Sequence, residues 1–170
     1  MNDGGMDHVD EILAQWNRER PDLDVGPMGM IGRLGRIVHF LTREMDKTFA
    51  EFGLTGASFD VLATLRRSGA PHSLSPGDLL ATMMITSGTL TNRIDQLEKA
   101  GLVARSHNPD DRRSVSVSLT PRGLATIDAA VTAHVETQKR LLSILAPEDQ
   151  TALDPLLRNF LAGIVERSSG

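Results

Sequence analysis

The fold of this chain is decided by residues 74–123, which read LSPGDLLATMMITSGTLTNRIDQLEKAGLVARSHNPDDRRSVSVSLTPRG. The first part predicts a short helix. Ser75 can cap the free backbone amides, Pro76 suits the first helical position, and Asp78 completes a capping box. A polar break over residues 85–88 separates this helix from the next one. We therefore expect a helix, a turn and a second helix.

The second helix is expected between Gly88 and Gly101. Its apolar residues recur at i, i+4 and i+7, as in an amphipathic helix, and they are Leu90, Ile94 and Leu97. Gly101 can end the helix, because glycine adopts the left-handed conformation without steric cost.

Two strands should follow, over residues 102–105 and 114–119, and the second alternates polar and apolar side chains. The charged residues 106–113 join them, and Thr120 and Pro121 can begin another helix. The pattern predicts a mainly α fold with a small β wing, that is, a winged helix-turn-helix.

The expected exposed face of the second helix carries short hydrogen-bonding side chains and one cation: Thr86, Ser87, Thr89, Thr91, Asn92, Arg93 and Gln96. Such side chains suit phosphates and base edges in a major groove. The face alone is equally compatible with an ordinary solvated surface, but the attached wing favours DNA binding.

Composition and charge agree with this interpretation. The 170 residues are 40% hydrophobic and contain no cysteine, which excludes disulfides and thiolate metal sites. No secretory signal and no run of roughly 20 apolar residues is present, so we expect one cytoplasmic structural domain without a membrane span. The net charge is −4, yet residues 86–122 hold six bases and four acids and form the most positive segment.

The remaining chain should be helical. Periodic apolar residues predict helices over residues 7–19, 28–52, 57–67 and 121–145, with another from Pro147 that is kinked or restarted at Pro155. Gly29, Gly32 and Gly35 suggest close helix packing. We divide the chain into residues 1–52, which carry an N-terminal extension helix and a long helix, a DNA-binding lobe over 53–122, and C-terminal helices over 123–170.

The terminal helices predict a dimer. One winged domain cannot cover all of these long apolar helices, so both ends of the chain are expected to form a two-fold homodimer interface. Such a dimer presents two recognition helices about 34–36 Å apart and implies a pseudo-palindromic operator.

The lobe resembles the MarR family of winged-helix regulators. The resemblance rests on Leu54-Thr55, Phe59-Asp60-Val61-Leu62, residues 86–103, Asp110-Asp111-Arg112-Arg113, and the pattern Val117-x-Leu119-Thr120-x-x-Gly123. It implies a homodimeric, non-enzymatic transcriptional regulator, usually a repressor released by a small ligand. By this match Arg113 enters the minor groove, Arg112 lies in the DNA-contacting wing, and Asp111 braces the wing.

A narrower resemblance is to the urate-responsive branch of that family. This branch carries a tryptophan in an N-terminal helix, an Asp after Leu-Thr, and two arginines, which correspond here to Trp16, Asp60, Arg93 and Arg105. An indole can stack on a purine anion, and an arginine fork can pair with its charge. Repulsion between the anion and Asp60 would then disturb the recognition helix. The resemblance implies an aromatic anionic ligand such as urate.

Several alternatives stay open at this point. The ligand can instead be a phenol or an aromatic carboxylate, Arg93 can contact DNA, ligand or both, and Arg105 can contact a phosphate. An adaptor that uses the winged helix for protein interaction should have an acidic or apolar wing, which this chain lacks. An enzyme would need a cofactor domain, and no motif for one is present. The five histidines show no metal-ligand spacing, so no metal or cofactor is expected.

Overall fold

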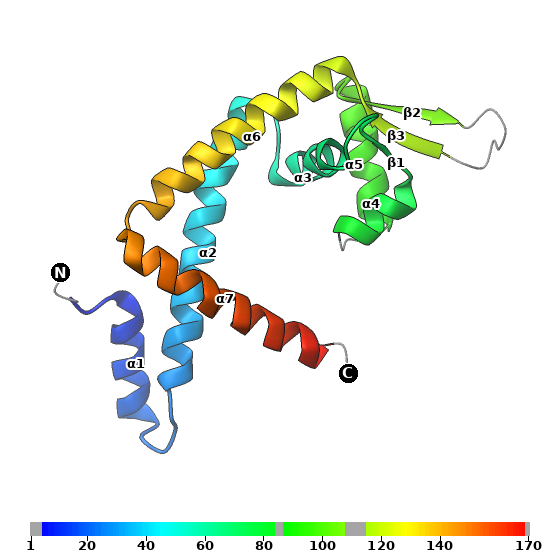
Figure 1. Ribbon diagram of the computed structural model, residues 1–170. Coiled ribbons are helices and arrows are strands. Elements are labelled where there is room, and N and C mark those ends of the chain that lie inside the picture. The colour runs from blue at the N-terminus through cyan, green and yellow to red at the C-terminus, as the bar shows by residue number, and fades with distance from the viewer. Residues whose placement is uncertain (1–4, 84–86, 108–114, 169–170) are drawn as a thin grey trace. The chain divides into compact units, whose positions relative to one another are not determined.

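The computed structural model describes residues 5–83, 87–107 and 115–168 (Figure 1). The chain forms two compact units, residues 1–44 and residues 45–170. Helix α2 (Gly26–Glu51) begins in the first unit and ends in the second.

The first unit is built from α1 (His8–Glu19) and the beginning of α2. Asp7 caps α1, and the side chain of Asp10 completes the capping box. Gly29 and Gly32 lie against Leu13 and Val9 of α1, which confirms that these glycines serve helix packing, whereas Gly35 has nothing within 4 Å.

The second unit contains the predicted helix-turn-helix and wing. Its helices are α3 (Gly56–Arg67), α4 (Pro76–Met83), α5 (Ser87–Lys99), α6 (Pro121–Leu142) and α7 (Pro147–Ser168). As predicted, the amide of Asp78 donates to Ser75 Oγ at 3.1 Å. The carboxylate of Asp78 accepts from the Ser75 hydroxyl at 2.7 Å rather than from its amide.

The sheet has one strand more than we expected. Strands β1 (Ser73–Leu74), β2 (Val103–His107) and β3 (Val115–Leu119) pair antiparallel in the order β1-β3-β2. Strand β1 is two residues long, so no alternation of side chains could reveal it from the sequence. It adds a third strand at the base of the hairpin formed by β2 and β3 (Figure 1).

The buried core lies between the helices of the second unit and the sheet. Its most completely buried large side chains come from α3, α4, α5, α6 and the sheet, and they are Val61, Leu62, Leu65, Leu79, Leu90, Ile127, Val103 and Val117. This burial fixes α5 on the lobe through its apolar stripe, so that the opposite stripe faces solvent.

A close backbone contact joins the wing to α6. The hydroxyl of Thr120, the N-cap of α6, donates to the carbonyl oxygen of Gly101 at 2.8 Å and accepts from the amide of Gly123 at 2.9 Å. A Cβ atom on Gly123 would lie 1.8 Å from the backbone oxygen of Leu102. Only glycine fits at this position, which gives the Leu-Thr-x-x-Gly pattern a physical reason.

Two expectations for the C-terminal part are wrong. Helix α6 ends at Leu142 rather than near residue 145, and α7 continues through Pro155 without a break. Proline removes one helical hydrogen bond, to the carbonyl oxygen of Thr151. Because α7 is exposed, water can hydrate that oxygen, and the ion pair between Asp154 and Arg158 spans the position at 2.8 Å.

The terminal helices differ from the lobe in burial. None of the residues of α7, all of which the structure describes, is buried. Its exposed apolar side chains include Leu156, Leu157, Phe160, Leu161, Ile164 and Val165. Further exposed apolar residues lie on α2, among them Ile31, Ile37, Val38 and Phe40.

Candidate nucleic-acid interface

Helix α5 presents a polar face to solvent. Its buried stripe consists of Leu90, Ile94 and Leu97, which are 1–2% exposed. The exposed face carries Thr89, Thr91, Asn92 and Gln96, and Arg93 is half-buried beside them. The amphipathic pattern predicted for this helix is confirmed, while contact of its polar residues with DNA stays a prediction.

The other residues that we predicted at the interface are Ser87 and four residues that the structure does not describe. Thr86, Asp111, Arg112 and Arg113 lie outside the described residues, and Ser87 is the first residue of α5. Of the wing, the structure describes strands β2 and β3. They pair over their full length, from Val103 with Leu119 to His107 with Val115.

Arg105 on β2 pairs with both acidic side chains of α5. Its guanidinium donates to the carboxylates of Asp95 and Glu98, and its backbone amide donates to Glu98 Oε1 at 3.1 Å. These hydrogen bonds raise the pKa of Arg105 above its ordinary value. The positive charge of Arg105 offsets one of the two negative charges that would otherwise repel phosphates, and the pairing ties the wing to α5.

This role of Arg105 was not anticipated from the sequence. We predicted the residue as a ligand contact or a phosphate contact, and its guanidinium is instead engaged by two carboxylates within the chain. A signal was present: Asp95 and Glu98 are spaced i, i+3 and therefore share one side of α5. Which strand residue faces that side depends on the sheet register, which periodicity alone does not give.

Asp60 on α3 lies in a positively charged environment. Burial raises the pKa of its carboxyl above the ordinary value, although the side chain is still exposed to solvent; Arg93, Arg67 and His134 oppose that rise in the pKa. The structure thus brings Asp60 close to Arg93, while the role of both residues in ligand binding stays a prediction.

A shallow cavity of about 250 Å³ opens beside Asp60. It lies between α3 and α4 and is lined by Phe59, Asp60, Ala63, Thr64, Arg67, Thr82 and Met83. Its polar groups are a carboxyl, a guanidinium and two hydroxyls, and Phe59 and Met83 provide apolar surface. The cavity is therefore a candidate for a small anion with an apolar body.

Three rings cluster at the Phe59 wall of this cavity: Phe49 stacks on Phe59 and on His134, while Phe59 and His134 are tilted to each other. Phe49 and Phe59 have centroids 4.3 Å apart, and His134 lies 5.2 Å from Phe49 and 5.0 Å from Phe59. Burial lowers the pKa of His134, and Asp60 partly opposes this shift of the pKa. This cluster fixes the start of α3, on which Asp60 stands.

Trp16 belongs to the other unit. It lies on α1 with 41% of its surface exposed, whereas Asp60, Arg93 and Arg105 belong to residues 45–170. Of the four predicted ligand residues, the structure therefore brings two together, shows Arg105 paired with carboxylates, and places Trp16 on a separate unit.

Within the described residues, no helix has the length and hydropathy needed to cross a membrane.

Comparison with known proteins identifies the chain. The family model for the MarR family matches residues 54–115. The chain is 46% identical over 149 residues to the HTH-type transcriptional regulator PecS of Dickeya dadantii, and the match covers 88% of this chain and 90% of PecS. The chain belongs to the MarR family.

Solved structures of DNA-binding regulators agree. The Bordetella bronchiseptica regulator BpsR, whose DNA binding is regulated by 6-hydroxynicotinic acid, matches with a TM-score of 0.64 and 31% identity over 76% of this chain and 90% of that one. A mutant of MarR from Escherichia coli, complexed with operator DNA, matches with a TM-score of 0.64 and 26% identity. The match covers 86% of this chain and 97% of that one. These matches confirm the predicted family and the winged helix-turn-helix fold.

Membership of the MarR family settles the broad function. The chain is a DNA-binding transcriptional regulator and not an enzyme, as the sequence predicted. Its lobe supplies the parts such a regulator needs: a helix with a buried stripe and an exposed polar stripe, and a wing held to that helix by Arg105.

Proposed function

We propose that this regulator is a repressor that binds a pseudo-palindromic operator as a homodimer. The observation that carries the proposal is the exposure of α7. Leu156, Leu161 and Ile164 are 65%, 62% and 47% exposed, and no described residue of their own unit, residues 45–170, buries them. Large contiguous apolar faces on a soluble domain indicate an interaction surface. A second copy of the chain offers the same face and can cover it about a two-fold axis.

The dimer gives the DNA contact its geometry. Each α5 would offer Thr89, Asn92 and Gln96 to base edges in one major groove. A two-fold axis separates the two helices by about one turn of DNA, roughly 34–36 Å. The relative from Escherichia coli was solved in complex with operator DNA, which supports operator binding by a chain of this fold.

Selection from random duplexes tests this proposal. Binding of the purified chain should enrich two inverted half-sites with centres about 10 base pairs apart. Phe160→Glu, on the apolar face of α7, should abolish the enrichment by charging the interface. Ala162→Glu, on the opposite side of the same helix, adds the same charge and should leave enrichment intact. Enrichment of single, unpaired half-sites by wild type would contradict the homodimer.

We further propose that a small aromatic anion, with urate as the first candidate, releases the regulator from DNA. Asp60, Arg93 and Arg67 form a mixed-charge site beside the cavity between α3 and α4. A planar anion could pair with an arginine fork there. We keep Trp16 as a proposed ligand residue, because an indole can stack on such an anion or donate a hydrogen bond to it. Arg105 can bind the anion only if the anion displaces the carboxylates of Asp95 and Glu98 from its guanidinium.

Release would follow from charge repulsion. A bound anion beside the Asp60 carboxylate favours movement of α3, and Arg93 on α5 responds to the same charge. The ligand can shift DNA binding only by the difference between its affinities for the DNA-competent state and the released state.

An aromatic carboxylate is the second candidate ligand. DNA binding of the relative BpsR is regulated by 6-hydroxynicotinic acid, which is a small aromatic acid. The proposed site has the same requirement for either ligand, namely a cation near an apolar cavity wall.

Fluorescence of Trp16 separates the candidates, because it is the only tryptophan. Urate and xanthine should quench it saturably, with salicylate and 6-hydroxynicotinic acid as carboxylate comparisons. Asp60→Asn should blunt the ligand-induced release from DNA while leaving DNA affinity intact. Saturable quenching by the two carboxylates alone would show that an aromatic carboxylate, and not urate, is the ligand. No response to any of the four compounds would refute the proposed site.

A further inference from the structure

Helix α1 packs closely on the first turns of α2. Val9 lies against Gly32, and Leu13 lies against Gly29, where an added Cβ atom would be 3.0 Å from Leu13 Cδ1. Because the later residue of α1 meets the earlier residue of α2, the two helices run antiparallel. Glycine at both positions allows the backbones to approach.

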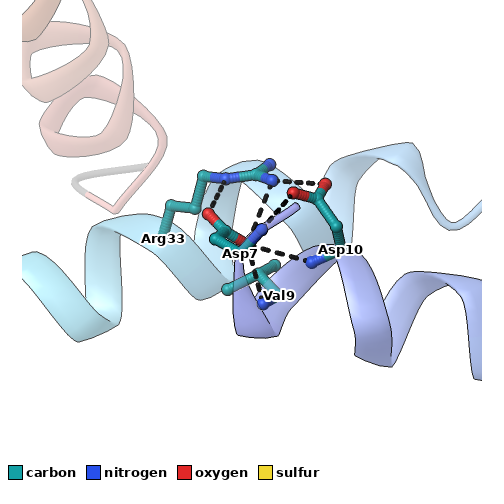
Figure 2. Close-up of polar contacts among 4 residues, drawn as sticks. All are labelled: Asp7, Val9, Asp10 and Arg33. Atoms are coloured by element: carbon teal, nitrogen blue, oxygen red, sulfur yellow. Dashed lines mark hydrogen bonds and ion pairs between the residues drawn. The ribbon is translucent and has the colours of Figure 1, made fainter. Parts of the chain in front are cut away.

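Arg33 on α2 closes this contact with a double ion pair (Figure 2). Its Nε donates to Asp7 Oδ2 at 2.8 Å, and its Nη2 donates to Asp10 Oδ1 at 2.5 Å and to Asp7 Oδ1 at 3.3 Å. The planar guanidinium fork therefore holds two carboxylates at the start of α1 at once.

Both carboxylates also build the start of α1. Asp7 Oδ1 accepts hydrogen bonds from the backbone amides of Val9 and Asp10 at 2.7 and 2.9 Å. Asp10 Oδ2 accepts one from the backbone amide of Asp7 at 3.0 Å (Figure 2). The hydrogen bonds from Arg33 hold the pKa of Asp7 down at about 2. The groups that nucleate α1 are therefore the groups that dock it on α2.

We infer that Arg33 is a positioning residue for Trp16: it anchors α1 on α2 through Asp7 and Asp10 and so fixes the helix that presents the indole. Trp16 follows Leu13 by three residues and Val9 by seven, so it shares their side of α1. The importance of this position for ligand release rests on the proposed function, in which Trp16 contacts the anion.

Four variants test the anchor. Arg33→Ala removes both ion pairs, and Asp7→Asn removes one charge while keeping a good N-cap residue. Arg33→Lys keeps the charge but cannot bridge two carboxylates as a planar fork does. The matched control is Glu11→Gln, which breaks the exposed pair between His8 and Glu11, both on α1, without touching α2.

The first readout needs no ligand. Amide exchange in α1 and acrylamide quenching of Trp16 should both increase about two- to fivefold in Arg33→Ala, as expected for loss of partly exposed ion pairs. Asp7→Asn and Arg33→Lys should give intermediate values, and Glu11→Gln should match wild type. Wild-type exchange and quenching in Arg33→Ala, or an equal change in Glu11→Gln, would overturn the inference.

The second readout separates this inference from the proposed ligand. The ligand used is the one, urate or a carboxylate, that quenches Trp16 in the wild type. Arg33→Ala should raise the ligand concentration at the midpoint of this quenching about two- to fivefold and leave DNA affinity unchanged. An unchanged midpoint would overturn the positioning role. If no ligand quenches wild type, the proposed ligand site fails, and exchange in α1 still decides the anchor.

Discussion

The lobe and the terminal helices use similar apolar residues in opposite ways. In the lobe, Leu62, Leu79 and Ile127 are completely buried by neighbouring elements of the same chain. In α7, Leu156, Leu161 and Ile164 are about half to two-thirds exposed. The difference shows that the lobe completes its own core, whereas the apolar face of α7 needs another surface to cover it.

The largest effect should come from the tightest contact in the lobe. Gly123→Ala places a Cβ atom 1.8 Å from the backbone oxygen of Leu102, so the wing and α6 must separate. We expect a loss of about 4 kcal/mol or more in the free energy of unfolding, measured by chemical denaturation.

Gly163→Ala in α7 is the matched control. A Cβ atom there meets nothing within 4 Å in the chain itself, so alanine should stabilise the helix by roughly 0.5–1 kcal/mol when unfolding is measured at protein concentrations too low for association through α7. Equal destabilisation by the two substitutions would remove the distinction between lobe and terminal helix.

Leucine truncation sharpens the same comparison. Leu62→Ala should lower the free energy of unfolding by about 2–5 kcal/mol at every protein concentration, because it opens a cavity in a core made by one chain. Leu161→Ala should act mainly through association, so its effect should depend on protein concentration. Denaturation at several concentrations measures both, and a concentration-independent loss for Leu161→Ala would argue against the dimer.

Arg105→Ala tests how the lobe prepares its surface for DNA. It leaves Asp95 and Glu98 unpaired on α5, so DNA affinity should fall by about 1 kcal/mol at moderate salt. The control is Arg66→Ala, which breaks the pair with Asp128 between α3 and α6. Titration of a labelled operator duplex measures both, and affinity losses of equal size would show that pairing on α5 has no special role.

The smallest effect should be the acid response of the first unit. The pKa of Asp7 is lowered by Arg33 from its ordinary value of 3.8 to about 2. A lowered pKa stabilises the folded state above pH 3.8, and this contribution disappears as the pH falls toward 2. Exchange in α1 should therefore quicken over that interval in wild type and less so in Asp7→Asn. Identical profiles would exclude Asp7 as the titrating group.

Much of the lobe was predictable because its signals are local. The capping residues Ser75 and Asp78, the apolar stripe of α5 and the alternation before Leu119 each act within one element. Strand β1 was missed because two residues carry no period. Continuation of α7 through Pro155 was missed because tolerance of proline depends on the solvent exposure of the helix, which the local sequence does not state.

The site was less predictable, because it depends on which elements meet. The partners of Arg105 depend on how β2 lies against α5. The partners of Arg33 lie 23 and 26 residues away in the sequence, at the start of α1. The four-residue ligand match stays a prediction, although the structure does bring Asp60 near Arg93. It contained no information on the pairing of Arg105 or on the anchor of α1.

The mass of the protein–DNA complex in solution tests the central claim most directly. Sedimentation of the chain on the selected inverted-repeat duplex should give two copies per duplex, and Phe160→Glu should reduce both the copy number and the affinity while Ala162→Glu should not. A single copy bound at full affinity, or two copies retained by Phe160→Glu, would contradict a regulator that reads DNA as a dimer joined through α7.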